Sequence, residues 1–137
     1  MSSRTLAVDF GEKRVGLAVT DPLGAAILPV PFLTYASISE LLFKLKSVAV
    51  EKEVGIIVLG LPRNPDGSSG PKAKECENLA EKIKKELGLP VHLEDESFTS
   101  READEILIRD LNLSRQKRKK VKDSLSACLI LKSYLSR

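Results

Sequence analysis

The chain has 137 residues, 42% of them hydrophobic and 30% charged, and it carries a formal net charge of +3. This composition excludes a disordered polypeptide, and the length suits a single globular domain, residues 1–137, with a core of its own. No apolar run approaches the roughly 18 residues that span a bilayer, and the N-terminus lacks a signal-peptide pattern. We therefore expect a cytoplasmic protein without a membrane partner.

The first third of the chain predicts three strands and a helix. The strands are expected at residues 4–10, 14–21 and 27–33. Pro29 and Pro31 mark the third strand as irregular or at a sheet edge. The short connections favour an antiparallel meander of these strands. Ser37 and Glu40 form a capping box, and the apolar residues that follow at helical spacing predict a helix.

The rest of the chain alternates between predicted strands and helices. Strands are expected at residues 54–60 and 90–94, and helices at 71–87, 99–110 and 121–136. The run at 54–60 is continuously apolar, which is typical of a strand covered on both faces. The order predicts an α/β fold: a mixed five-stranded sheet, made of a three-stranded antiparallel meander and two parallel strands, with helices on both faces.

The two cysteines and the single histidine do not form a zinc-binding pattern. Cys76 and Cys128 lie on the apolar stripes of predicted helices, so we expect buried thiols without a disulfide. His92 lies in a predicted strand, where a packed histidine is the ordinary case, and nothing in the sequence supports a Ser–His catalytic pair.

Acidic residues stand at the ends of two of the predicted strands. Asp9 ends the first strand, and Glu94, Asp95 and Glu96 end the last. Ligands collect beyond the carboxyl ends of parallel strands, so acids at these ends are candidates for a site. Asp123 falls in the first turn of the last helix, on its apolar stripe. The favourable interaction of an acid with a helix N-terminus would also explain Asp123.

If Asp9, Glu96 and Asp123 came together, their mutual repulsion would require a divalent metal between them. Oxygen ligands without histidine or cysteine suit Mg²⁺ or Mn²⁺. Two such ions roughly 4 Å apart activate a water and stabilise the leaving oxygen in phosphodiester hydrolysis. The spacing alone is equally compatible with acids scattered over the surface.

Cations gather near the last predicted helix. Residues 115–122, RQKRKKVK, contain six cations and no acid, a pattern that favours a phosphate-bearing partner. A solubilising surface loop is the alternative. Lys13 and Arg14 lie at the turn between the first two predicted strands, where they either contact phosphates or are simply solvated.

Four segments resemble one protein family in the same order along nearly the whole chain. VDFGEKRVGLAVTD resembles its D-x-G-x-K-R-x-G stretch, and VLGLPRNPDGSSG is similar to its G-L-P-x-N-x-D-G loop. EDESFTSREAD resembles its D-E-R-x-T-T segment, and VKDSLSACLIL its D-S-x-A-A-x-x-L helix. The chain thus resembles the YqgF/RuvX family of the ribonuclease H-like superfamily, which is related to Holliday-junction resolvases.

The resemblance implies an acidic catalytic and metal site at Asp9, Glu96 and Asp123. The residues expected to contact nucleic acid are Lys13, Arg14, Arg63, Asn64, Arg115, Lys117, Arg118, Lys119 and Lys120. Two positions depart from the family pattern. Ser97 stands where the family usually has arginine, and Lys122 replaces an apolar residue.

The function that the resemblance implies is a metal-dependent nuclease that processes the 5′ end of pre-16S ribosomal RNA. The alternative is a Holliday-junction resolvase that acts on branched DNA, and a non-catalytic RNA-binding module is a third interpretation. The D-x-G-x-x-x-x-G pattern also resembles the first phosphate loop of actin-like ATPases, although those proteins need two such lobes. We expect a monomer or a weak dimer that prefers single-stranded RNA.

Overall fold

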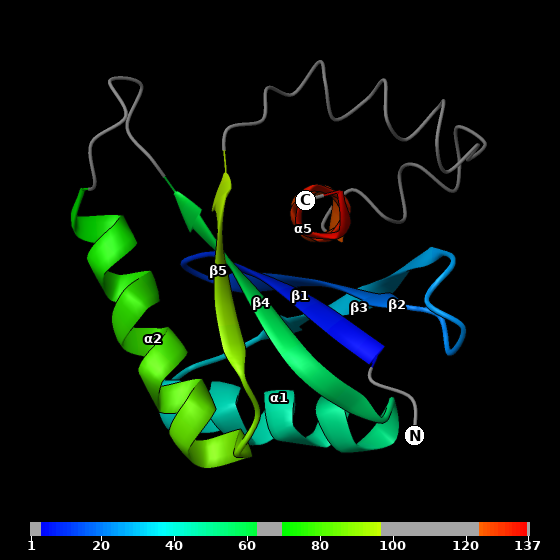
Figure 1. The fold of residues 1–137 in the computed structure, drawn as a ribbon. Helices are drawn as coiled ribbons and strands as arrows, with labels where there is room; N and C mark the ends of the chain where they lie inside the picture. Colours follow the sequence, from blue (N-terminus) through cyan, green and yellow to red (C-terminus); the bar gives the residue numbers. More distant parts are fainter. Residues whose placement is uncertain (1–3, 63–69, 97–123, 137) are drawn as a thin grey trace.

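The computed structural model describes residues 4–62, 70–96 and 124–136, and of Glu96 only the backbone. Figure 1 shows the fold. The elements are β1 (Arg4–Phe10), β2 (Arg14–Thr20), β3 (Ile27–Thr34), α1 (Ile38–Glu51), β4 (Val54–Pro62), α2 (Pro71–Leu87), β5 (Val91–Glu96) and α5 (Leu125–Leu135). None of the helices in the described part of the chain is long and apolar enough to cross a membrane.

The strands form one five-stranded sheet in the order β3-β2-β1-β4-β5. β2 pairs antiparallel with both β1 and β3, which makes the meander. β4 pairs parallel with both β1 and β5. The structure therefore confirms the predicted mixed sheet, with β1 as the central strand.

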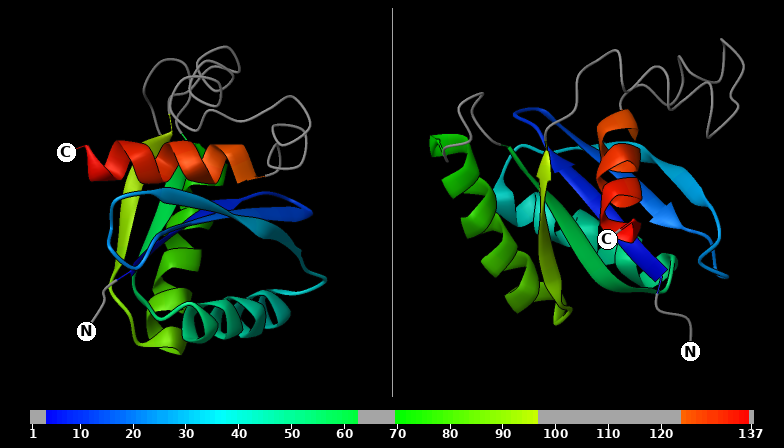
Figure 2. Two further views of the ribbon diagram at one scale, coloured as in Figure 1. Left: turned by 90° about the vertical axis from the view of Figure 1, so that its right-hand side faces the viewer. Right: turned by 45° about the horizontal axis from the view of Figure 1, so that its top comes forward.

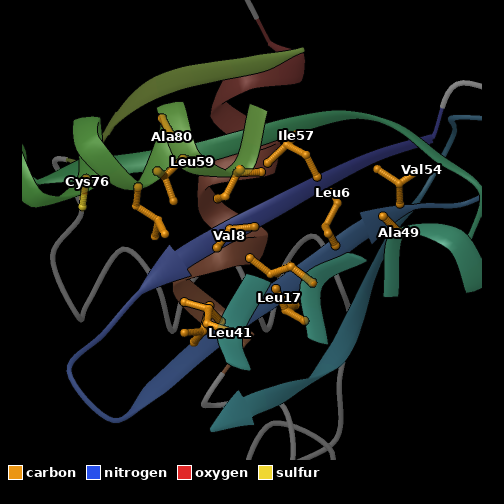
Figure 3. Close-up of a cluster of buried hydrophobic side chains, with 14 of the residues drawn as sticks. Leu6, Val8, Leu17, Leu41, Ala49, Val54, Ile57, Leu59, Cys76 and Ala80 are labelled. Carbon is orange, nitrogen blue, oxygen red and sulfur yellow. The ribbon is translucent and has the colours of Figure 1, made fainter. Parts of the chain in front are cut away.

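Helices cover the two faces of the sheet, as predicted: α1 and α2 lie on one face and α5 on the other (Figure 2). The larger hydrophobic core lies between the sheet and the α1/α2 pair (Figure 3). Leu6 and Val8 of β1 point into this core and are fully buried, while Ala7 between them points toward α5. Successive side chains of a strand point to opposite faces, so this alternation fixes the two faces of β1.

The predicted apolar stripe of the last helix faces the sheet. Ala127, Ile130 and Leu131 of α5 are fully buried against a surface formed by Ala7, Ala18 and Val58. These three strand residues have small or short side chains on the α5 face. They allow the helix to lie close to the strands. The helix α5 therefore packs directly on the sheet and crosses its strands.

Two hydrogen bonds tie α5 to opposite edges of the sheet. The Ser124 hydroxyl, just before the helix, donates to the Val30 carbonyl of β3 at 2.6 Å. Near the other end of α5, the Ser133 hydroxyl donates to the Glu94 carboxylate of β5 at 2.7 Å. Glu94 is only 7% exposed. A buried carboxylate needs donors, so the Ser133 hydroxyl stabilises both the charge and the helix position.

The helix ends follow their sequence signals. The Ser37 side chain accepts from the Glu40 backbone N–H at 3.2 Å, as the capping box predicted. α2 begins at Pro71 and is capped by Gly88, which adopts a left-handed conformation with φ of 68°. A residue with a side chain would be strained in that conformation.

The remaining differences from the predicted elements are small. β5 continues two residues beyond the predicted strand because its parallel pairing with β4 extends to Pro62 opposite Glu96. Cys76 and Cys128 are buried and form no disulfide, as predicted, and burial raises the pKa of the Cys128 thiol to about 12. The predicted helix at 99–110 lies outside the described residues.

The hydrogen bond between α5 and β5 predicts the effect of Ser133→Ala on stability. The substitution removes a donor from the buried Glu94 carboxylate, so the free energy of unfolding should fall by about 1–3 kcal/mol. Urea unfolding followed by circular dichroism measures it. Ser47→Ala is the matched control because the exposed Ser47 hydroxyl donates to the Phe43 carbonyl of its own helix. Equal stability losses for both variants would contradict the stabilising role of the Ser133–Glu94 bond.

Candidate functional site

The carboxyl ends of three parallel strands meet at one edge of the sheet. β1, β4 and β5 all point the same way, as the arrows in Figure 1 show, and they end at Phe10, Pro62 and Glu96. The acids predicted at strand ends, Asp9 on β1 and Glu94 to Glu96 on β5, therefore belong to this edge of the sheet. The same edge carries the β1–β2 hairpin, because β2 begins where β1 ends.

Asp9 projects from the central strand on the face that α5 covers. Ala7 packs under α5 and Val8 packs in the opposite core, so alternation places Asp9 on the α5 face. Its direct partner on β2 is Gly16. Because Gly16 has no side chain, β2 places no side chain beside the Asp9 carboxylate at this pair.

The pairing of β4 with β1 and β5 places an acid of β5 level with Asp9. Val8 pairs with Leu59, and the next residue of β4, Gly60, pairs with Glu94. Asp9, Gly60 and Glu94 therefore follow one another across the sheet. Adjacent strands lie about 4.8 Å apart, so the Cα atoms of Asp9 and Glu94 are separated by roughly 10 Å, with a glycine between them.

The two hydrogen bonds between the α5 region and the sheet lie on opposite sides of Asp9. Ser124, the residue after Asp123 in the sequence, is bonded to β3, two strands from β1 on one side. Ser133 is bonded to Glu94 of β5, two strands from β1 on the other side. We predicted that Asp123 lies at the start of this helix. The helix thus begins on one side of Asp9 and ends on the other.

Most of the other predicted site residues lie outside the described part of the chain. For Glu96 the structure gives only the backbone, which ends β5. The following lie outside the described residues: Asp123, Arg63, Asn64, Arg115, Lys117, Arg118, Lys119 and Lys120, together with Ser97 and Lys122. Within residues 4–62, 70–96 and 124–136, no three His, Cys, Asp or Glu side chains are grouped to hold a metal.

The hairpin between β1 and β2 is held by its backbone. The Gly11 N–H donates to the Arg14 carbonyl at 3.1 Å. A Cβ atom at position 11 would lie 2.5 Å from that same carbonyl oxygen, so this tight turn requires glycine. The Tyr35 hydroxyl donates to the Gly11 carbonyl at 2.8 Å.

Tyr35 is well suited to this donor role. Partial burial, together with the nearby carboxylates of Glu75 and Glu12, raises the pKa of the Tyr35 hydroxyl. The group therefore stays protonated at neutral pH and can donate to the Gly11 carbonyl. Tyr35 also stacks on Phe10, with 5.7 Å between the ring centroids. The hairpin beside Asp9 is thus supported from the opposite face of the sheet.

Lys13 and Arg14 are both exposed at this hairpin, as the sequence indicated. The Arg14 guanidinium lies over the ring of Phe32 on β3, 4.8 Å from the ring centroid. Neither Phe32 nor Tyr35 was identified from the sequence. Phe32 follows Pro31 in an irregular strand, and its partner on β2 depends on a register that the local sequence does not indicate.

One pocket among the described residues lies away from Asp9. It has a volume of about 340 Å³ and is lined by Phe10, Ile38, Glu75, Asn78, Leu79 and Lys82. Phe10 is adjacent to Asp9 in β1 and therefore projects from the opposite face of the sheet. The pocket thus belongs to the α1/α2 side and does not contain the predicted acids that the structure describes.

The comparisons with known proteins agree with this fold and with the predicted family. A family model described as RuvX, Holliday junction resolvase, matches residues 3–137. A protein of Oenococcus oeni, provisionally named a pre-16S rRNA nuclease, is 41% identical over 136 residues, which cover 98% of this chain and 94% of the relative. A protein of Leuconostoc mesenteroides with the same provisional name is 40% identical over 135 residues, 96% of this chain and 94% of the relative.

Among solved structures, that of Thermus thermophilus RuvC has a TM-score of 0.66 with 13% sequence identity, and the match covers 97% of this chain and 95% of RuvC. At this identity the likeness shows the fold alone, which is the ribonuclease H-like fold that the motifs implied. The prediction of a nuclease agrees with the names of the relatives. From the family match over nearly the whole chain and relatives at 40% and 41% identity, we conclude that the chain belongs to the RuvX family.

Proposed function

We propose that the protein is a divalent-metal-dependent nuclease that hydrolyses phosphodiester bonds and processes the 5′ end of pre-16S ribosomal RNA. The position of Asp9 carries the proposal. Its carboxylate stands at the carboxyl end of the central strand, on the face that α5 crosses, beside two strand positions that hold glycine. The provisional names of the relatives support the choice of substrate.

We infer that Asp9, Glu96 and Asp123 form the acidic site. Glu96 ends β5, the strand that carries Glu94 level with Asp9. Asp123 precedes Ser124, whose hydroxyl is bonded to the carbonyl of Val30. Each of the other two acids is therefore adjacent in the sequence to backbone that the structure fixes: Glu96 ends a paired strand, and Asp123 precedes the bonded Ser124.

Carboxylate oxygens are the donors that Mg²⁺ and Mn²⁺ prefer, so this set of acids fits either ion. When bound, the metal supplies an activated water and stabilises the charge on the leaving oxygen. The chain itself positions the substrate. Gly16 and Gly60 add no side chains beside Asp9 on the two neighbouring strands, and Lys13 and Arg14 offer positive charge at the adjacent hairpin.

Holliday-junction resolution is the second candidate function, because the family description names it. Symmetrical cutting of a junction requires two active sites related by a dyad. One observation favours a second copy: α1 leaves Phe43 73% and Val50 72% exposed. The buried stripes of α2 and α5 are already used against the sheet, so this short strip on α1 supports at most a weak dimer.

The acidic site predicts the effects of three substitutions. Asp9→Asn, Glu96→Gln and Asp123→Asn each remove a negative oxygen ligand while nearly preserving shape. Each should abolish cleavage of an RNA substrate in Mg²⁺ or Mn²⁺, with the fold retained in circular dichroism. Affinity for the RNA should be kept, because repulsion of phosphate falls. Glu86→Gln, on the exposed side of α2, is the control and should cleave normally. Full activity in any one of the three variants would remove that residue from the site.

The basic segment predicts a change in salt dependence. Replacing Arg115, Lys117, Arg118, Lys119 and Lys120 with glutamine should weaken RNA binding for all sequences alike, because phosphate contacts carry no base information. The slope of log affinity against log salt should flatten by about 0.7–0.9 for each phosphate that the protein no longer neutralises.

A charge-matched control replaces exposed lysines of α1 and α2, namely Lys46, Lys74, Lys82, Lys84 and Lys85. This variant loses the same net charge, but from helices on the face opposite to Asp9. It should keep most of the salt slope. If both variants changed the slope equally, the basic segment would contribute only through net charge.

The substrate preference is tested by comparing single-stranded RNA with a four-way DNA junction at equal enzyme concentration. We expect the single-stranded RNA, including a precursor of the ribosomal RNA 5′ end, to be cut faster. Sedimentation analysis of the same sample reports whether the enzyme is dimeric. Paired symmetrical nicks in the junction, made by a stable dimer and faster than RNA cleavage, would instead establish the resolvase function.

A further inference from the structure

An arginine and an aromatic ring are paired on the surface next to the proposed site. The Arg14 guanidinium lies 4.8 Å from the centroid of the Phe32 ring. Arg14 is exposed, and Phe32 is 36% exposed although it is a large hydrophobic residue. The pair belongs to β2 and β3, at the end of β2 that carries the hairpin.

A bulge in β3 brings Phe32 to this position. Val15 pairs with Leu33 and Leu17 pairs with Val30, so two residues of β3, Pro31 and Phe32, stand opposite the single residue Gly16. Val30 and Leu33 both pack in the core on the α1 face. The extra residue directs the Phe32 ring out of that core and toward Arg14.

The pair lies close to Asp9 on the same face of the sheet. Asp9 pairs with Gly16, and Arg14 is two residues from Gly16 on the same strand. Arg14 and Asp9 are therefore diagonal neighbours on one face, with Cα atoms about 7–8 Å apart. The intervening Gly16 has no side chain. No side chain of β2 thus stands between the Arg14–Phe32 pair and the Asp9 carboxylate.

We propose that Arg14 and Phe32 form a stacking platform for one unpaired base of a single-stranded nucleic acid whose backbone passes Asp9. Bases of single strands stack on aromatic side chains and on arginine planes. The ring also restrains the Arg14 side chain, so less conformational entropy is lost when a base binds. The inference rests on the proposed nuclease function. It adds to that function a preference for unpaired substrate, which the Arg14–Phe32 platform provides.

Paired nucleic acid would gain little from this platform. Bases inside a duplex, or in the arms of a fully paired junction, are already stacked on their neighbours and present only their edges. Unstacking them costs a few kcal/mol per base. A platform beside Asp9 therefore favours cleavage in an unpaired segment, where the base is available without that cost.

The test compares binding of a fluorescent oligouridine with binding of an abasic oligomer of the same length and charge, in EDTA so that no cleavage occurs. Phe32→Leu keeps an apolar side chain of similar size but removes the ring, and Phe32→Tyr keeps the ring. Phe43→Ala is the control, because Phe43 is also exposed but lies on α1, on the opposite face of the sheet. Thermal melting confirms that each variant is folded.

We expect Phe32→Leu to weaken oligouridine binding about five- to tenfold, the low end of base–aromatic stacking, since the ring is only partly exposed. Phe32→Tyr and Phe43→Ala should bind as the wild type does. The abasic oligomer should bind Phe32→Leu and wild type equally. Wild-type affinity of Phe32→Leu for oligouridine, or an equal loss for the abasic oligomer, would overturn the proposal.

A metal-dependent cleavage assay on the wild type separates this inference from the proposed function. Ring-dependent binding without any cleavage would leave the platform in place and refute the nuclease. Cleavage with ring-independent binding would leave the nuclease in place and refute the platform.

Discussion

The parallel pairing of β4 with both β1 and β5 is the constraint on which the rest of the structure depends. It brings three strand ends to one edge and sets Asp9, Gly60 and Glu94 side by side across the sheet. A shift of one residue in either pairing would turn the β5 acids to the other face. The apolar run of β4 secures the register because Ile57, Val58 and Leu59 are buried on both faces of the sheet.

The helix α5 covers the face of the sheet on which Asp9 lies. It lies close to the sheet because the strand residues beneath it are small, and its two ends are bonded to Val30 and Glu94. The same face carries Asp9, and the Arg14–Phe32 pair lies beside Asp9. Positioning of the proposed catalytic acids and recognition of an unpaired base would thus depend on one packing arrangement.

Local signals made much of the fold predictable. The Ser37 capping box and the Gly88 cap mark the helix ends, and the order of elements predicts the mixed sheet. The end of β5 was not predictable, because pairing with β4 overrides the low strand propensity of consecutive acids. Phe32 was missed for a similar reason: its outward position results from a shift of register against β2, which is a tertiary property. The Glu94–Ser133 bond joins residues 39 positions apart and has no local signature.

We propose above all that Asp9 is a metal ligand at the carboxyl end of the central strand. Mn²⁺ binding, measured by electron paramagnetic resonance of the free ion, tests this claim without requiring a substrate. We predict that Asp9→Asn weakens Mn²⁺ binding by more than about tenfold, since even outer-shell changes at metal sites cost that much. Glu86→Gln, on the exposed side of α2, should bind Mn²⁺ as the wild type does. Equal Mn²⁺ affinity of Asp9→Asn and wild type would contradict the assignment of Asp9 as a ligand.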